Sequence, residues 1–355
     1  MNLPPTPPLP EPSPTAGWPK QLGRAAVFLL VMFSTWAAFN TDWLAAKWTA
    51  HRLARADNDT QRTAYAERLL RYGQVGVREL GHCLEADDDA LRTVAVAAFK
   101  KSLATAPEHD PSPRVIAAVI LDQFTTAPPH GRQAILQLLP PILERTGGAF
   151  VMRCRGVVAE ALQHDDPALQ FAAAQLAVHP DIRLRAEVRP LLNSADARVR
   201  GAALFAAASP SADEPPLSDE ELFRWLHDPD ETVRKICHDL LVTRERTEAE
   251  ITLGRRLTHP DATERLKLLL DLRYDDDVTD PEPWLERLSR DGEPAVRAGA
   301  ARVAVELSLH RFQPCPSWVS RIAEADPHPT VRGVAAFYRS QQTAARGPVR
   351  PASSP

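Results

Sequence analysis

Six of the eleven histidines share a setting that could bind a metal ion or titrate near neutral pH. Each lies beside Asp or Pro at a turn between two predicted helices: His109, His164, His179, His227, His259 and His328. Neighbouring helices pack about 8–10 Å apart, whereas a zinc–nitrogen bond measures about 2.0–2.1 Å, so equivalent turns hardly share one ion. We therefore expect these side chains to cap helices or bind helix ends, and we predict no metal-ligating residue.

The rest of the sequence contains no residue that we would name as catalytic. Walker, dinucleotide-binding, HExxH, Gly-x-Ser-x-Gly and EF-hand patterns are absent from it. The most acidic stretch, YDDDVTDPEPW from Tyr274 to Trp284, lacks the ligand spacing of a calcium loop. We interpret it as a solvated loop and predict no cofactor.

The cysteines stand far apart and form no CxxC pair or Cys/His cluster: Cys83, Cys154, Cys237 and Cys315. Such thiols usually pack as small hydrophobic groups, and Cys237 supports this because sibling repeats have Ala at its position. A disulfide would require an oxidising compartment, and the spacing does not argue for one. We expect four unlinked thiols.

The composition is that of a helical protein with a sizeable core. The chain has 355 residues, of which 44% are hydrophobic, and its formal net charge is −4. This charge does not make the whole chain a polyanion binder. Hairpin signals are scarce and the apolar spacing is mostly helical, so the sequence predicts an all-α fold.

A phrase of an acidic turn followed by Val-Arg and small apolar residues recurs along the chain. DPDETVRKICHDLL starts at Asp228, DGEPAVRAGAARVA at Asp291 and DPHPTVRGVAAFYR at Asp326. The steps, including variants, fall at Leu91-Arg92, Leu169-Gln170, Val199-Arg200, Val233-Arg234, Val296-Arg297 and Val331-Arg332, with a degenerate copy near Glu264-Arg265. From Leu169 onward the interval is about 30–35 residues, which indicates stacked supersecondary units.

Each unit can be explained as two antiparallel helices, as residues 218–243 illustrate. Ser218 or Asp219 can cap the first helix and Asp230 the second, after a Pro-containing turn. The second helix places apolar residues at the i, i+3, i+4 and i+7 spacing of a buried face: Val233, Ile236, Cys237 and Leu240. A pair cannot bury both of its faces alone, so the pairs must stack.

This repeat resembles the HEAT family, in particular the short HEAT-like version of phycobilisome lyase-type proteins, from about Val75 to Gln342. The resemblance implies a right-handed α-solenoid over residues 73–342, with about eight stacked antiparallel pairs. Second helices should start near residues 90, 131, 168, 197, 230, 261, 293 and 328. In HEAT proteins the repeated Arg commonly pairs with an Asp of the same or the adjacent repeat, which implies a structural ladder of Arg200, Arg234, Arg297 and Arg332. A row of phosphate-binding arginines is the alternative.

The N-terminal region predicts a tail and a membrane anchor. Residues 1–19 hold eight prolines and should be an extended, disordered tail. The uncharged run from Ala25 to Phe39 spans only about 22 Å of a hydrocarbon core of about 30 Å. Its flanks extend it, so we predict a single transmembrane helix within residues 20–48, with a cleaved signal or a soluble helix as alternatives. Its orientation is left open. Residues 49–72 should form a linker and capping helix, and residues 343–355 a second disordered tail.

These features favour a non-catalytic scaffold held at a membrane, with a protein or peptide partner on its concave face. The candidate contact residues lie on second helices outside the core stripe: Phe205, Lys235, His238, Asp239, Arg302 and Phe337. Exposed phenylalanines there would be contact hot spots, although both could instead be buried against first helices. HEAT-like enzymes, of the DNA glycosylase or bilin lyase type, and a self-assembling element are the alternatives. A basic concave surface would favour DNA, and a mixed groove would favour a protein.

Overall fold

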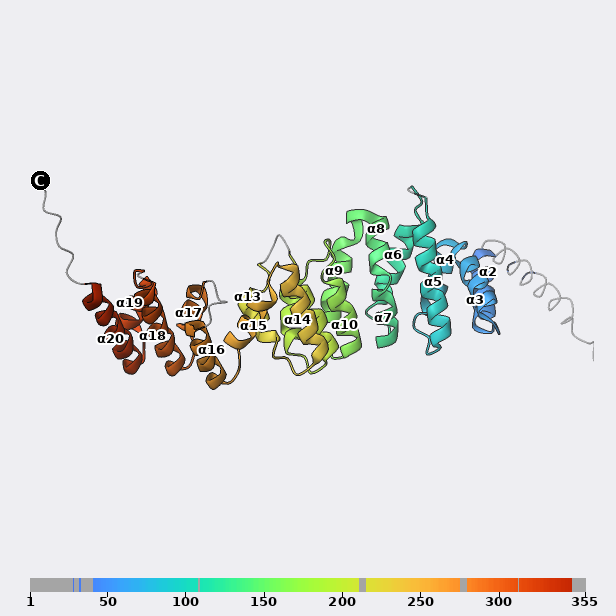
Figure 1. Ribbon diagram of the computed structural model, residues 1–355. Coiled ribbons are helices and arrows are strands. Elements are labelled where there is room, and N and C mark those ends of the chain that lie inside the picture. Colours follow the sequence, from blue (N-terminus) through green and yellow to red (C-terminus); the bar gives the residue numbers. More distant parts are fainter. Residues whose placement is uncertain are drawn as a thin grey trace, which may run out of the picture. The chain divides into compact units, whose positions relative to one another are not determined.

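The computed structural model of the chain is all-helical in the part that it describes, which confirms the predicted fold class. It describes residues 28, 32, 41–107, 109–210, 215–274, 280–311 and 313–346. Within these ranges every regular element is a helix, and no strand occurs. The chain divides into two compact units, residues 1–157 and 158–355, with the division inside α9 (Val151–Leu162) (Figure 1).

The first unit consists of short helices that alternate between two rows. They are α2 (Thr41–Ala54), α3 (Asp59–Leu70), α4 (Gly73–His82), α5 (Asp89–Thr105), α6 (Ser112–Gln123), α7 (Pro129–Leu136), α8 (Leu139–Thr146) and η1 (Gly147–Phe150). Helices α2, α4, α6 and α8 pack in succession, while α5 packs against both α3 and α7. The core between the rows is built from fully buried Leu53, Leu80 and Phe99.

The second unit repeats this arrangement. Its helices are α10 (Pro167–Leu176), α11 (Arg185–Val188), η2 (Arg189–Asn193), α12 (Ala197–Ala208), α13 (Asp219–Trp225), α14 (Glu231–Thr243), α15 (Glu248–Leu257), α16 (Ala262–Tyr274), α17 (Glu282–Leu288), α18 (Pro294–His310), α19 (Ser317–Ala325) and α20 (Pro329–Arg346). Helices α10, α12 and α14 pack in succession. Helices α16, α18 and α20 do the same (Figure 1). Direct packing between α14 and α16 is weaker, and α15 packs against both of them.

Every second helix begins within two residues of its predicted start. The observed starts are Asp89, Pro129, Pro167, Ala197, Glu231, Ala262, Pro294 and Pro329. The cause is local, because Asp88, Asp166, Asp196 and Asp230 each cap a helix by accepting hydrogen bonds from backbone N–H groups of its first turn. Turn chemistry thus fixes where these four helices start, whereas α7 and α18 begin at prolines without a side-chain cap.

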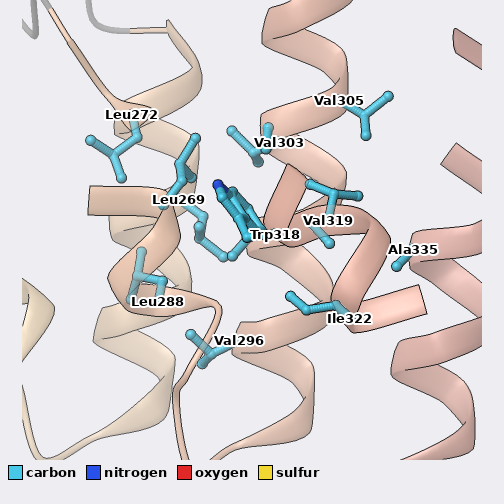
Figure 2. Packing of buried hydrophobic residues seen from close by; sticks show 14 of the residues in the cluster. Leu269, Leu272, Leu288, Val296, Val303, Val305, Trp318, Val319, Ile322 and Ala335 are labelled. Carbon is cyan, nitrogen blue, oxygen red and sulfur yellow. The ribbon is translucent and has the colours of Figure 1, made fainter. Parts of the chain in front are cut away.

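Apolar packing joins consecutive pairs, as the core around Trp318 shows (Figure 2). The indole of Trp318 in α19 is 4% exposed and lies among Leu269 of α16, Val303 of α18 and Val319. Ala335 of α20 and Val296 of α18 belong to the same buried cluster. One core therefore runs through three consecutive pairs, because no pair covers its own apolar faces.

The segment predicted as linker and capping helix takes part in a helix pair. Helices α2 and α3 pack against each other, and then against α4 and α5. Ala46, Thr49 and Leu53 of α2 are buried there. At the other end, α20 continues to Arg346, four residues into the segment predicted as a tail.

Most of the predicted membrane anchor, residues 20–48, lies outside the described residues, as does the tail of residues 1–19. Within the described ranges, no helix combines the length and the apolar character that crossing a membrane requires. Residues 41–48 belong to α2, in which Trp43 and Trp48 are exposed.

No disulfide joins the four cysteines, which all lie in the described ranges, as predicted. Cys83, Cys154 and Cys237 are buried, and Cys315 is partly exposed. Burial raises the pKa of Cys83 and Cys237 to about 12 and that of Cys154 to about 11. The three buried thiols therefore stay protonated at neutral pH and pack as small hydrophobic groups.

Candidate functional site

A bidentate ion pair links consecutive second helices. Arg297 of α18 donates from Nε to Oδ2 of Asp326 at 2.8 Å and from Nη2 to Oδ1 at 3.0 Å. Its third nitrogen, Nη1, donates to the carbonyls of Asp291 and Gly292, which lie six and five residues earlier in its own turn. One guanidinium therefore ties its own turn to the turn of the next pair.

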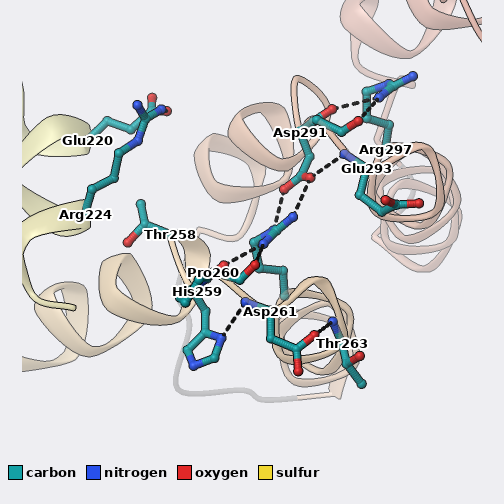
Figure 3. A network of polar contacts seen from close by, with 12 residues as sticks. Glu220, Arg224, Thr258, His259, Pro260, Asp261, Thr263, Asp291, Glu293 and Arg297 are labelled. Carbon is teal, nitrogen blue, oxygen red and sulfur yellow. Dashed lines mark hydrogen bonds and ion pairs between the residues drawn. The ribbon is translucent and has the colours of Figure 1, made fainter. Parts of the chain in front are cut away.

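The same geometry recurs at two other steps of the ladder, where a step joins one second helix to the turn of the next pair. Arg200 binds Asp228 at 2.9 and 2.8 Å. Arg265 binds Asp291 at 2.7 and 2.9 Å, and Figure 3 shows Asp291 with the bonds to its carboxylate dashed. Each also donates from Nη1 to carbonyls six and five residues earlier. The carboxylates are 4–9% exposed, so these are buried pairs.

Two of these pairs, Arg200–Asp228 and Arg297–Asp326, shift the pKa values of their members. For Asp228, burial alone would raise the pKa, but hydrogen bonds from Arg200 and from the Asp230 N–H outweigh it and the pKa lies below its ordinary value. The pKa of Asp326 is lowered mainly by its hydrogen bonds from Arg297. The pKa values of Arg200 and Arg297 are raised by the same hydrogen bonds. Both partners are therefore charged across the physiological range.

The predicted ladder is confirmed at Arg200 and Arg297, and it is wrong in detail at Arg234 and Arg332. These two donate from Nη1 to the carbonyls of their own turns but bind no carboxylate in the described part of the chain. Arg332 lies in the last helix pair of the described ranges. Arg265, which looked degenerate in sequence, makes the complete set of bonds.

Several turn histidines take the capping role that the sequence predicts. Nδ1 of His164 and of His259 accepts a hydrogen bond from the backbone N–H two residues later. In an equivalent turn, Oδ1 of Asp228 accepts the corresponding hydrogen bond from the Asp230 N–H. His179 makes the same bond, and His227 Nε2 lies 2.7 Å from the carbonyl of Arg255. The rings of His109 and His328 make no hydrogen bond within the described ranges, so the capping role stays a prediction for them.

Four of the six predicted contact residues occupy one repeated position. It lies five residues after the ladder residue, by which we mean the Arg of the recurring Val-Arg step, or its equivalents Gln170 in α10 and Arg265 in α16. This position, which we call the exposed row, is held by Gln175, Phe205, Asp239, Leu270, Arg302 and Phe337. All six are exposed, and Phe205 and Phe337 are 50% and 56% exposed. Five residues turn a helix by roughly 140° beyond one full turn, which carries the row away from the buried stripe. The two phenylalanines are therefore not buried against first helices.

The end of the exposed row contains an aromatic and cationic cluster. Phe337 lies edge-on to Tyr338, with ring centroids 5.3 Å apart, and the Arg302 guanidinium lies 5.7 Å from the Tyr338 ring centroid. Arg302 also donates to Glu306 at 2.9 Å, and this hydrogen bond raises its pKa. Two predicted contact residues from neighbouring helices, α18 and α20, thus meet at Tyr338.

Phe205 borders an apolar cavity of about 440 Å³, which we call the Phe205 groove. Its lining comes from α10, α12 and the start of α14: Phe171, Gln175, Ala197, Arg198, Gly201, Ala202, Phe205, Asp230, Thr232 and Ile236. Gly201 keeps part of the space open, because a Cβ there would lie 2.9 Å from Cδ1 of Ile236. The groove has the size and apolar character to accept a large side chain.

Lys235 and His238 lie in a second cavity, of about 640 Å³, which we call the Arg234 pocket. It is lined by Leu226, Glu231, Arg234, Lys235, His238, Glu248, Ile251, Thr252, Arg255, Arg256 and His259, mostly from α14 and α15. His238 Nε2 lies 3.1 Å from Glu248 Oε2, and this hydrogen bond raises the pKa of His238. Asp239 lies beside the pocket, with a carboxylate oxygen 3.7 Å from His238 Nδ1.

Sequence reasoning missed Arg255 and His259 as pocket residues, and it treated Arg234 as a ladder residue. The available signal was His259 itself, which stands where the turns of Arg234, Arg297 and Arg332 have Asp. The sequence does not show that α15 packs between α14 and α16, so the pocket could not be predicted. No cluster of His, Cys, Asp or Glu suited to a metal ion occurs in the described ranges.

The fold and this surface define an all-helical protein of consecutive helix pairs, with an exposed row along its second helices. No protein-family model and no curated protein matches the chain. Solved structures do match, among them the crystal structure of an engineered protein from the Northeast Structural Genomics Consortium. It is 17% identical, the match covers 84% of this chain and 90% of that one, and the TM-score is 0.34. That score is too low to carry an argument about fold or function.

Proposed function

We propose that the chain is a membrane-tethered, HEAT-like scaffold that binds a protein or peptide on the exposed row. In this proposal the helix pairs form a right-handed α-solenoid, the second helices line its concave face, and binding involves no catalysis. Residues 20–48 would hold the scaffold at the membrane. The partner would be a protein or peptide rather than a nucleic acid.

The periodic ladder supports the solenoid. The bond from a ladder residue to a carbonyl six residues earlier occurs in every second helix from α10 to α20. In the first unit, Arg92 makes it to Ala86 and Arg62 to Ala56, so α2 and α3 count as one more pair. A repeated bond at a repeated position is what stacked equivalent units produce.

The single observation that carries the binding function is the half-exposed Phe205 beside an apolar groove. A large aromatic side chain left in water at a cavity is typical of an interaction site, and aromatic residues dominate contact hot spots. Phe337 occupies the equivalent position on α20, so the unit presents two aromatic contact points. Asp239 and Arg302 between them supply charges of both signs, which suits a protein partner.

The charges of the ladder weigh against a nucleic-acid partner. Arg200, Arg265 and Arg297 are neutralised by buried carboxylates, so they are not available to phosphates. The exposed row itself combines aromatic, aliphatic, acidic and basic residues. A phosphate backbone would require a continuous run of unpaired cations.

Site-directed photo-crosslinking in producing cells tests the binding function. A benzoyl-phenylalanine at position 205 or 337 replaces an exposed aromatic ring with one of similar shape. We expect both positions to crosslink to the same partner. Met152, which is 75% exposed on α9, is the matched control outside the row and should give no such product. Identical products at all three positions, or none at 205 and 337, would contradict the proposal.

The membrane tether is tested separately, by fractionation with an alkaline carbonate wash. We expect the full-length chain to stay in the washed pellet and a chain lacking residues 1–40 to leave it. This deletion keeps α2, whose residues Ala46 and Leu53 are buried in the first unit. Release of both chains into the soluble fraction would reject the tether without affecting the binding proposal.

A further inference from the structure

The ladder is interrupted at Arg234. Its Nη1 donates to the carbonyls of Asp228 and Pro229 at 2.8 and 2.9 Å, as in its equivalents. We call a ladder step complete when Nε and Nη2 of the arginine bind the carboxylate of the next turn. The steps of Arg200, Arg265 and Arg297 are complete. At Arg234 no hydrogen bond or ion pair to Nε or Nη2 occurs within the described ranges. Two strong donors therefore lie unused at a partly buried position.

The interruption has an identifiable cause. His259 stands where the corresponding turn of a complete step has Asp, and its Nδ1 keeps only the capping bond to the Asp261 N–H. Direct packing between α14 and α16 is also weaker than at the neighbouring steps. The space opened there is the Arg234 pocket, of about 640 Å³. At this step the turn supplies His259 in place of a carboxylate, and the cavity opens beside the guanidinium of Arg234.

The remaining charges of the pocket leave it positive. Lys235 and Arg255 make no ion pair in the described part of the chain, so together with Arg234 they present three unpaired cations. Among the other pocket residues, Arg256 pairs with Asp271 and His238 pairs with Glu248. Among the carboxylates of the pocket lining, Glu231 alone has no cationic partner within the described ranges. A partly desolvated site of this kind attracts an anion more strongly than an exposed arginine does.

We propose that the Arg234 pocket binds the carboxylate of an acidic side chain supplied by a bound protein segment. The carboxylate would accept hydrogen bonds from Nε and Nη2 of Arg234 and so complete the ladder step, with Lys235 and Arg255 at the rim. The occupant is a carboxylate because the same edge of the guanidinium binds one at each complete step. This inference rests on the proposed function and names the chemistry of the partner.

The position of the pocket also defines the rest of the segment. The Phe205 groove contains Thr232 and Ile236 of α14, while the Arg234 pocket contains Glu231 and Lys235 of the same helix. The two cavities therefore flank the first turns of α14. A helix is about 10 Å across, which about three extended residues span. The partner segment should carry an acidic residue about three positions from a large apolar one.

Binding of a defined probe tests the pocket without a known partner. The full-length chain in detergent micelles is titrated into a fluorescein-labelled hexaglutamate peptide at low salt, and anisotropy gives the dissociation constant. Hexaglutamine with the same label is the uncharged control, and inorganic phosphate is the competitor. We expect hexaglutamate to bind, hexaglutamine not to bind, and phosphate to compete only weakly.

Two variants test the pocket by opposite changes. Arg234→Gln removes the cation but keeps the carbonyl bond, as Gln170 does naturally at the equivalent position. His259→Asp leaves every cation in place and adds a carboxylate, which either pairs with Arg234 or lowers the local positive potential. We expect each variant to weaken hexaglutamate binding at least tenfold. Arg332→Gln is the matched control, because Arg332 makes the same carbonyl bonds but lines none of the cavities described above, and it should change affinity less than twofold.

Unchanged affinity in Arg234→Gln and His259→Asp would overturn the proposal, as would phosphate binding tighter than hexaglutamate. Thermal unfolding of each variant by circular dichroism separates lost binding from lost folding. If Arg234→Gln does not fold, His259→Asp still decides. Crosslinking at positions 205 and 337 without hexaglutamate binding would support partner binding on the exposed row and reject carboxylate binding in the Arg234 pocket. Hexaglutamate binding without position-specific crosslinks would reject partner binding on the exposed row and support carboxylate binding in the Arg234 pocket.

Discussion

Asp326 is bound by the arginines of two successive helix pairs. Its carboxylate accepts two hydrogen bonds from Arg297 of α18, at 2.8 and 3.0 Å, while its carbonyl accepts one from Nη1 of Arg332 at 2.6 Å. The side chains of Arg297 and Asp326 are 11% and 5% exposed. The turn of one pair is thereby fixed to the second helix of the pair before it, in addition to the apolar core they share.

Removing the cation of this pair should destabilise the fold. Arg297→Gln can keep a carbonyl bond but leaves Asp326 as a buried charge without a partner, which costs about 3 kcal/mol of unfolding free energy. Urea denaturation followed by circular dichroism measures the change. Arg198→Gln is the control, because Arg198 is 68% exposed and solvent screens its pair with Asp196, so its loss should change stability little. Equal losses in the two variants would contradict a structural ladder.

The lowered pKa of Asp326 predicts acid sensitivity of defined sign. A carboxyl whose pKa is lower in the folded than in the unfolded state stabilises the fold fully above the unfolded value, about 3.9. This contribution is lost as the pH falls through the folded pKa. Asp326→Asn should therefore have a lower unfolding free energy than the wild type at pH 7, and the difference should shrink below pH 4. Urea titrations at pH 7, 5, 4 and 3 measure it; a difference that grows in acid would contradict the assignment.

The sequence was sufficient for the all-helical class and the helix starts, because both depend on local chemistry. Asp88 or Asp230 caps the helix that follows it whatever the tertiary context, and apolar spacing marks the buried stripe. The sequence left open whether Phe205 and Phe337 are exposed, and the structure settles it: both lie five residues after a ladder arginine, at an exposed position. Periodicity places a residue on a helix face, but it does not show what faces it.

What the sequence could not show depends on packing between helices far apart in the chain. Arg265 looked degenerate because Glu264 replaces the usual Val, yet its guanidinium makes every bond of a complete step. Arg234 has the regular motif but binds no carboxylate within the described ranges, because the position 25 residues later that would supply one is held by His259. The Arg234 pocket arises only when α15 packs between α14 and α16.

Two histidines near the pocket should titrate on opposite sides of the ordinary value. The hydrogen bond to Glu248 raises the pKa of His238 above 6.5, whereas burial lowers that of His227. Since the pKa of His238 is raised, its contribution to stability is complete below the unfolded value and is lost as the pH rises through the folded one. NMR titration of the imidazole carbon-bound protons measures both. Glu248→Gln should lower the pKa of His238 and leave that of His227 unchanged; an unchanged His238 would contradict the pair.

Gly254 of α15 is a position where one added methyl group should be costly. A Cβ there would lie 2.4 Å from two atoms of the Phe223 ring, which is 1% exposed and packs against Trp284. Gly254→Ala should lower the unfolding free energy by about 1–3 kcal/mol, because the ring cannot move aside. Gly292, with nothing within 4 Å, is the control, and Gly292→Ala should be neutral or slightly stabilising. Urea denaturation measures these changes. Adding Phe223→Leu to Gly254→Ala should recover part of the lost unfolding free energy, because the Leu side chain is smaller. If it recovers none, the ring is not the obstacle.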